Sequence, residues 1–251
     1  MDKPNHLFTR TVALFDVHMP EHDPQFLKVI LKFLERVQPQ CLLLGGDFVD
    51  FEAVSSHPGG SHRMKLKKEL APVKVGLAQL RAACERARII WLEGNHETRL
   101  SRYIDSRAPE LADCLDIPTL LDFDKLGIQW IPEDEQPIRI GKTKILHGHQ
   151  VDGGGQYPAR KLVEVYGESG VTVMCGHFHR LQVVTKPMDP DPAVGMVLGC
   201  GRTLDPRWRH GAKGGWQHNV AVIDVTTSGT TMVHVVPVVK GRMTWGDEVF
   251  G

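Results

Sequence analysis

The sequence lacks the features that would direct a protein to a membrane or a secretory route. No apolar stretch approaches the roughly eighteen residues needed to span a bilayer, and residues 1–10 contain no apolar signal core. The chain also lacks a net charge, because 30 Lys and Arg residues balance 30 Asp and Glu residues. This balance gives no global sign of a polyanionic partner, but a local basic patch could still attract one. We expect a soluble, cytoplasmic protein with no membrane partner.

Cysteine is scarce and scattered, which argues against a disulfide framework. The five cysteines are an odd number without a motif spacing, so buried free thiols in a reducing cytoplasm are the simplest interpretation. Internal repeats, low-complexity segments and linkers are absent from the sequence as well. The 251 residues, 41% of them hydrophobic, suit one globular domain over 1–251.

Metal-binding side chains recur in five short clusters, each after an apolar run or beside a turn glycine. The runs at 11–15, 41–44 and 88–92 are typical of buried strands, whose carboxyl ends are where ligands bind in open α/β sheets. One cluster alone could be a strand end or a helix N-cap, but five in this order favour a functional site. The clusters are Asp16-Val17-His18, Gly46-Asp47-Phe48-Val49-Asp50, Gly94-Asn95-His96-Glu97, His147-Gly148-His149 and Gly176-His177-Phe178-His179.

The chemistry of these side chains suits two bridged divalent cations. One carboxylate can join the two ions, while imidazoles and an amide oxygen complete their coordination. Histidine and carboxylate ligands without thiolates favour Mn²⁺, Fe, Zn²⁺ or Ni²⁺ over a cysteine-rich structural zinc site.

From about Thr11 to about Arg180, the order and spacing of the clusters resemble the calcineurin-like metallophosphoesterase superfamily. The chain also resembles the compact phage and prophage members, a phosphodiesterase and nuclease branch. The resemblance implies a dinuclear metal hydrolase of phosphate esters, with manganese as the first candidate metal. It implies that Asp16, His18 and His179 hold one ion, that Asp47 bridges, and that Asn95, His147 and His177 hold the other.

The expected fold class is α/β. Strands and helices alternate up to residue 106 and mostly strands follow from Ile128, which indicates two packed sheets. The resemblance implies a four-layer α-β-β-α sandwich of two mixed sheets flanked by helices. Helices are predicted over 24–37, 98–106 and 63–86, the last with an interruption at Pro72.

The expected mechanism is direct attack on phosphorus by a hydroxide that bridges the two metals, without a covalent enzyme intermediate. The resemblance places His96 beside the scissile phosphate, where it would assist the leaving group, and gives Asp50 the role of orienting it. Glu97 is expected to support its own loop or the start of the following helix.

Two positions favour a diester over a monoester. Protein phosphatases of this superfamily carry an arginine directly after the second aspartate and another before the glycine of the third cluster. This chain has Phe51 and Glu93 there. Losing an arginine clamp matters most for a dianionic monoester. We therefore expect a phosphodiesterase acting on DNA, RNA or nucleotides. The alternatives are a phosphomonoesterase and, in a different class, a non-catalytic scaffold like the retromer subunit of this superfamily.

Four residues are candidates for substrate contact. Arg99 follows the third cluster on a predicted helix, where Arg102 more simply forms part of a solvated face. His149 is expected to line the pocket. Tyr157 ends a glycine-rich loop that borders the site, and Arg202 lies in a late stretch rich in Gly, Arg and Trp.

Overall fold

A six-stranded sheet forms one half of the central sandwich in the computed structural model, which describes residues 7–56, 64–112, 114–151, 156–206 and 215–251. Strands β1 to β4 run parallel, and β10 and β11 add to the β1 edge in antiparallel fashion. In spatial order the strands are β11 (Thr231–Val238), β10 (His218–Thr226), β1 (Phe8–Leu14), β2 (Cys41–Leu44), β3 (Arg88–Leu92) and β4 (Ile128–Ile131).

A five-stranded sheet forms the other half. Its central strands β6, β7 and β9 are parallel, and antiparallel strands β5 and β8 close its two edges. In spatial order the strands are β5 (Ile138–Ile140), β6 (Thr143–Ile145), β7 (Thr172–Cys175), β9 (Ala193–Val197) and β8 (Gln182–Lys186).

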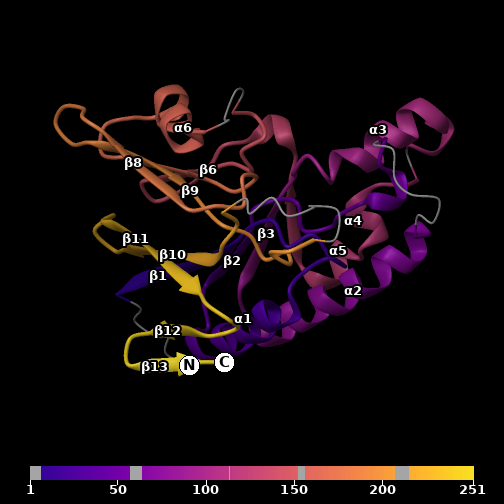
Figure 1. Ribbon diagram of the computed structural model, residues 1–251, viewed down its shortest axis with the longest axis horizontal. Helices are drawn as coiled ribbons and strands as arrows, with labels where there is room; N and C mark the ends of the chain where they lie inside the picture. The colour runs from indigo at the N-terminus through magenta and orange to yellow at the C-terminus, as the bar shows by residue number, and fades with distance from the viewer. Residues whose placement is uncertain (1–6, 57–63, 113, 152–155, 207–214) are drawn as a thin grey trace.

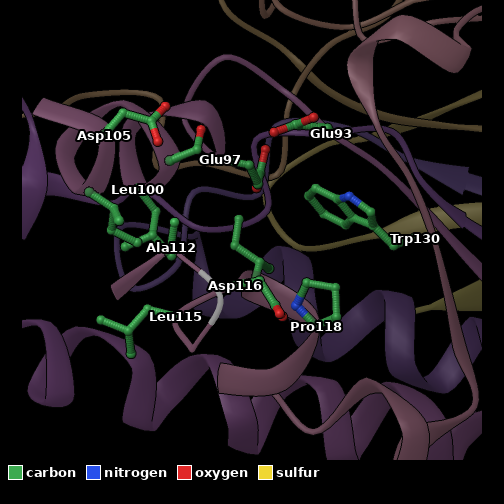
Figure 2. A pocket seen from close by; sticks show the side chains of 12 residues that line it. Glu93, Glu97, Leu100, Asp105, Ala112, Leu115, Asp116, Pro118 and Trp130 are labelled. Carbon is green, nitrogen blue, oxygen red and sulfur yellow. The ribbon is translucent and has the colours of Figure 1, made fainter. Parts of the chain in front are cut away.

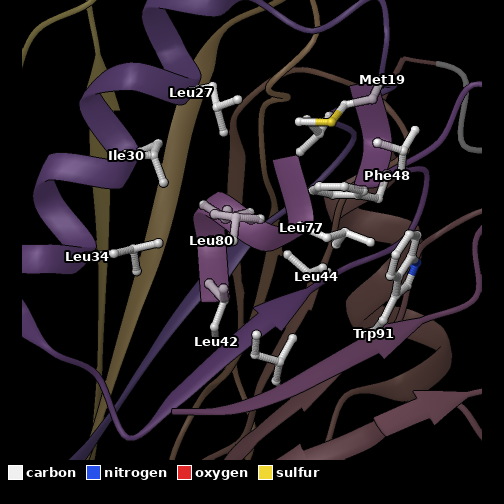
Figure 3. Packing of buried hydrophobic residues seen from close by; sticks show 14 of the residues in the cluster. Met19, Leu27, Ile30, Leu34, Leu42, Leu44, Phe48, Leu77, Leu80 and Trp91 are labelled. Atoms are coloured by element: carbon white, nitrogen blue, oxygen red, sulfur yellow. The ribbon is translucent and has the colours of Figure 1, made fainter. Parts of the chain in front are cut away.

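Side chains alternate between the two faces of each strand and so build three apolar layers. In β2, Leu42 and Leu44 pack toward the helices, whereas Leu43 packs between the sheets. Both faces of this sheet are covered, which explains the continuous apolar runs in the sequence. Helices α1 (Pro24–Val37) and α2 (Leu66–Ala83) cover the first sheet, with their leucines against β2 in Figure 3.

Helix α6 (Pro158–Tyr166) covers the second sheet on the opposite side of the molecule (Figure 1). The layers therefore run helix, sheet, sheet, helix, and the expected four-layer α/β sandwich is confirmed.

Local signals define the ends of α1. The Asp23 carboxylate accepts hydrogen bonds from the amides of Gln25 (2.8 Å) and Phe26 (3.0 Å), and Pro24 occupies the first turn. The prediction of an interruption in α2 was wrong, because the helix continues through Pro72. The carbonyl that loses its partner belongs to Lys68, which is exposed, so water can replace the missing amide there.

Strands β12 (Met243–Trp245) and β13 (Glu248–Phe250) form a hairpin near the C-terminal end that was not predicted. Phe33 of α1 holds it, with its ring centroid 5.5 Å from that of Phe250 and 5.8 Å from that of Trp245. Helix α3 (Thr98–Arg107) was predicted. Five short helical segments were not: η1 (Glu52–Val54), η2 (Pro109–Leu111), α4 (Ile117–Leu120), α5 (Phe123–Leu126) and η3 (Glu133–Glu135).

Within the described ranges, no helix combines the length and the apolar character that crossing a membrane requires.

Candidate metal centre

The five clusters lie together at the carboxyl ends of parallel strands from both sheets. Asp16 follows β1, Asp47 follows β2 and Asn95 follows β3, while His147 and His177 follow β6 and β7 of the second sheet. The sandwich therefore brings ligand-type side chains from two sheets to one shared edge, as expected for α/β sheets.

Five of the candidate ligands have a left-handed backbone that non-glycine residues rarely adopt. Their φ angles lie at 53° for Asp16, 51° for His18, 50° for Asp47, 66° for His177 and 57° for His179. Such a conformation costs of order 1–3 kcal/mol each and persists only where the surroundings hold it, typically at functional sites. The amide of His18 donates to the Asp47 carbonyl (2.9 Å), and the amide of His177 donates to the Asp16 carboxylate (2.8 Å).

The first group of candidate ligands consists of Asp16, His18 and His179. The two imidazole Nε2 atoms are 3.1 Å apart, and His179 Nε2 lies 3.2 Å from Asp16 Oδ1. All three side chains are buried. These are the residues that the resemblance assigns to one metal ion.

The second group consists of Asp47, His147 and His177, with Asn95 beside them. His147 Nε2 lies 3.3 Å from Asp47 Oδ2 and 3.1 Å from Asn95 Oδ1. Asp47 Oδ2 also lies 3.7 Å from Nε2 of His18 in the first group. Asp47 thus reaches both groups, as a bridging carboxylate must.

The spacing of these atoms fits cation binding. Ligand atoms about 2.1 Å from one shared ion lie roughly 3 Å from each other, which matches the Nε2–Nε2 distance of 3.1 Å between His18 and His179. Asp16 Oδ1 is buried and accepts no hydrogen bond of normal geometry from the described residues. A buried carboxylate oxygen without a donor is costly unless a cation satisfies it.

The tautomers fit cation binding too. His147 Nδ1 lies 2.9 Å from the Gly45 carbonyl, which can only accept, so Nδ1 carries a proton and Nε2 is the ring nitrogen that faces Asp47 and can bind a cation. Burial and then His96 lower the pKa of His18 to about 3, which keeps this imidazole in the neutral form that binds metals.

His147 and Asp47 form an ion pair when no cation is bound, with the proton on the imidazole. Burial lowers the pKa of His147, but the Asp47 carboxylate outweighs burial and raises that pKa to about 10. A divalent cation bound by the same two groups would displace this proton, as metals do when they bind histidine.

Two glycines leave room for the ligand carboxylates. A Cβ on Gly94 would meet Asp47 Oδ1 at 2.4 Å, and a Cβ on Gly176 would meet Asp16 Oδ2 at 2.2 Å. A side chain at either position would displace a candidate ligand, which explains why these clusters begin with glycine.

Asp50 connects the candidate ligands with the candidate catalytic histidine. Its Oδ1 lies 2.9 Å from His18 Nδ1 and 3.2 Å from His96 Nδ1, and its carbonyl oxygen lies 2.8 Å from His96 Nδ1. Although burial raises the pKa of Asp50, these hydrogen bonds and Arg202 hold it well below its usual range. The predicted pairing of Asp50 with His96 agrees with this geometry, and the contact with His18 is additional.

Arg99 contacts the outer side of His96. Its Nη1 donates to the Asp50 carbonyl (2.8 Å), and its Nη2 lies 3.0 Å from His96 Nε2. A guanidinium can only donate, so His96 Nε2 accepts in this arrangement. Arg99 is therefore in the site, where the sequence analysis expected a substrate contact.

The other predicted substrate contacts lie in different places. Arg202 is buried and its Nη1 donates to Asp50 Oδ1 at 2.7 Å, so it holds Asp50 instead of projecting toward a substrate. His149 pairs with Glu133 (2.8 Å) and lies at the outer side of the second group. Tyr157 is 64% exposed at the start of α6, and most of the glycine-rich loop before it falls outside the described residues.

Glu97 has a larger structural role than its sequence position suggested. Its carboxylate is fully buried and accepts four backbone hydrogen bonds. Oε2 accepts from the amides of Asp47 (2.7 Å) and Gly94 (2.9 Å), and Oε1 accepts from those of Phe48 (2.8 Å) and Val49 (3.1 Å). Glu97 thus fixes the loops that carry Asp47 and Asn95.

The fold and the paired His/Asp groups define a metal-dependent phosphoesterase. Residues 10–181 match the calcineurin-like phosphoesterase family, and the chain belongs to that family. It is 28% identical to the Gene 54 protein of Mycobacterium phage D29 in an alignment of 257 positions that covers 96% of this chain and 98% of that protein. The Gene 54 protein of Mycobacterium phage L5 is 26% identical over 260 residues, with the same coverage. These relatives fit the expected phage branch.

Among solved structures, Vacuolar Protein Sorting 29 from Cryptosporidium parvum shares the fold with a TM-score of 0.50. The two chains are 12% identical, and the match covers 98% of this chain and 99% of that one.

Proposed function

We propose that this chain is a phosphodiesterase that uses two divalent metal ions, Mn²⁺ foremost, to hydrolyse nucleic acid or nucleotides. Fe, Zn²⁺ and Ni²⁺ suit the same ligands. Support comes from two groups of His/Asp side chains, all buried except the half-buried His177, that Asp47 connects. The five unpaired cysteines support a reducing, cytoplasmic location as part of the proposal.

The proposed ligands follow the two groups in the structure. One ion would be held by Asp16, His18 and His179. The other would be held by His147, His177 and Asn95. Asp47 would contact both ions. When bound, such a metal pair neutralises phosphate charge and activates water for attack.

His96 would assist the departing oxygen. Burial lowers its pKa, but Asp47 and the hydrogen bond to Asp50 outweigh burial, so the net pKa of His96 is raised. With Nδ1 fixed by Asp50, the protonated ring would present Nε2–H to the leaving group. Arg99 also directs an N–H at this Nε2. At 3.0 Å no substrate oxygen fits between these two nitrogens, so Arg99 would turn away from Nε2 when the ring is protonated.

One observation supports a diester over a monoester: the described arginines of the site are already bound to the protein. Arg202 is buried against Asp50, and Arg99 is shared between the Asp50 carbonyl and His96. Phe51, where the related phosphatases have an arginine, is fully buried in the core. No bidentate clamp for a phosphate dianion is built from these residues, and a diester monoanion depends less on one.

The test compares bis(p-nitrophenyl) phosphate with p-nitrophenyl phosphate, using metal-stripped protein to which Mn²⁺, Zn²⁺, Ni²⁺ or Mg²⁺ is returned. The proposal expects metal-dependent turnover with a higher kcat/KM for the diester. A higher kcat/KM for the monoester would establish a phosphatase instead. Absence of turnover with two ions bound would favour a binding role.

The role of His96 needs two leaving groups. His96→Ala should lower kcat by roughly 10²–10⁴ on a dinucleotide, whose alkoxide leaves poorly, and by much less on the p-nitrophenyl diester. An equal loss on both substrates would contradict proton donation and indicate a positioning role. Arg86→Ala, an exposed arginine before β3, is the control and should leave both rates unchanged.

A further inference from the structure

A cavity of about 530 Å³ begins at the metal centre and continues along helix α3. Asn95 and Arg99, both part of the site, line its inner end. Arg102, Tyr103 and Arg107 line it farther along the helix. The cavity thus joins the place where a scissile phosphate would bind to a surface outside the ligand groups.

The lining residues of α3 follow helical periodicity. Positions 99, 102, 103, 106 and 107 recur at intervals of three and four, so they form one face of the helix. At 1.5 Å per residue, this face extends about 12 Å from the first position to the last. With about 3.4 Å between the charges of one stacked strand, that length accommodates on the order of three nucleotides.

The two sides of α3 differ in charge. Among the described residues that line this cavity, three are arginines and none is acidic. A separate cavity of about 280 Å³ lies on the other side of α3, with Glu93, Glu97, Asp105 and Asp116 in its lining (Figure 2). A polyanion would be attracted to the first cavity and repelled by the second. A helix with basic residues spread evenly around it would not direct a polyanion to one side in this way.

Tyr103 adds an aromatic surface between the arginines. Its side chain is 45% exposed although it lies on a rigid helix that Leu100 and Ile104 anchor in the core. Aromatic rings beside cationic side chains are how proteins bind single strands, since each base offers a face for stacking and each nucleotide a phosphate. A duplex keeps its bases stacked inside and would not use such a ring.

We propose that this α3 groove, formed by Arg102, Tyr103 and Arg107, binds the nucleotides that flank the scissile phosphate in a single-stranded polynucleotide. The inference rests on the proposed phosphodiester chemistry and narrows its substrate class. Arg102 and Arg107 bind phosphates, and Tyr103 stacks on a base. The exposed guanidiniums explain how a chain without net charge can attract a polyanion locally.

The kinetic test uses metal-loaded protein with oligo(dT) or oligo(rU) of increasing length, and with bis(p-nitrophenyl) phosphate, which is too small to fill the groove. The wild-type chain should gain kcat/KM with length until about three flanking nucleotides are bound. In the double variant Arg102→Ala/Arg107→Ala, the ratio of oligonucleotide to small-diester kcat/KM should fall at least tenfold. Arg86→Ala should not change the ratio.

A binding test keeps this inference separate from the catalytic one. Fluorescence anisotropy of labelled single strands with metal-stripped protein measures the groove without hydrolysis. Each arginine removed should reduce the slope of log affinity against log salt by about 0.7. Tyr103→Ala should weaken binding about fivefold or more, and Tyr103→Phe should retain it.

The outcomes are distinct. Unchanged oligonucleotide affinity and an unchanged substrate ratio in the double arginine variant would overturn the groove, even if the small diester is hydrolysed. Tighter binding of a duplex than of its single strand would overturn it as well. If no diester is hydrolysed but single-strand binding falls in the variants, the groove stands and the proposed chemistry fails.

Discussion

Glu97 offers the sharpest test of how the site is built, because one carboxylate holds two ligand loops. Replacing it by glutamine keeps the shape but turns one oxygen into an NH₂ group. Each oxygen accepts two backbone amides, so either orientation of the new amide leaves two buried N–H groups facing a donor. The loops that carry Asp47 and Asn95 would lose half of their anchoring.

The magnitude follows from that count. A buried donor left without an acceptor costs about 1–3 kcal/mol, so two of them cost roughly 2–6 kcal/mol in the free energy of unfolding. For a protein of this size, 1 kcal/mol shifts Tm by about 2–4 °C. Glu97→Gln should therefore lower Tm by roughly 4–24 °C. Displaced ligand supports typically weaken metal binding by about 10–100-fold.

Glu69 provides a matched control. It is also buried, and each of its oxygens accepts one amide, from Glu52 at 2.7 Å and Ala53 at 3.0 Å, which lie two and three residues after Asp50, itself not a proposed metal ligand. Glu69→Gln leaves one donor unsatisfied and should lower stability by about 1–3 kcal/mol without changing Mn²⁺ affinity.

Differential scanning calorimetry and Mn²⁺ titration of the two variants make the comparison. If Glu97→Gln bound Mn²⁺ as tightly as the wild-type chain, or if both variants lost Mn²⁺ affinity equally, the assigned role of Glu97 would be refuted.

Three further predictions follow from the site. Gly176→Ala should displace Asp16, because the new Cβ would lie 2.2 Å from its Oδ2; elemental analysis should show less bound metal, and normal metal content would contradict this. Asp50→Asn should lower the pKa of His96 by removing a negative charge, so activity that needs protonated His96 should decline at lower pH than in the wild-type chain; an unmoved alkaline limb in the pH–rate profile would rule this out. Removing the metal with a chelator should lower Tm, and Mn²⁺ at about 100 times its Kd should add about 2.7 kcal/mol to the free energy of unfolding. A Tm that does not change with Mn²⁺ would argue against binding by the folded chain.

The sandwich fold and the proximity of the five clusters could both be predicted from the same pattern in the sequence. Buried parallel strands appear as short apolar runs, and polar residues directly after such runs must lie at one edge of the sheet. Asp16, Asp47 and His147 were accessible to this argument because each follows a strand closely.

Other features depend on contacts between distant parts of the chain. Arg202 reaches Asp50 across 152 positions, and no local pattern indicates that partnership. Glu97 looked like a helix-start residue because three of its four amide partners, those of residues 47–49, become neighbours only after the sheet forms. The left-handed backbone at His177 and His179 is likewise stabilised by the assembled site, since even histidine, which is enriched in this region among non-glycine residues, adopts it rarely.

The central claim is that this chain binds a catalytic pair of divalent ions, and a stoichiometric activation curve tests it most directly. Metal-stripped protein, at a concentration well above the Kd for Mn²⁺, is titrated with Mn²⁺ while hydrolysis of bis(p-nitrophenyl) phosphate is followed. The account predicts that activity rises until about two ions per chain are bound, and that Asp47→Ala abolishes it. Full activity at one ion per chain, or undiminished activity in Asp47→Ala, would contradict the account.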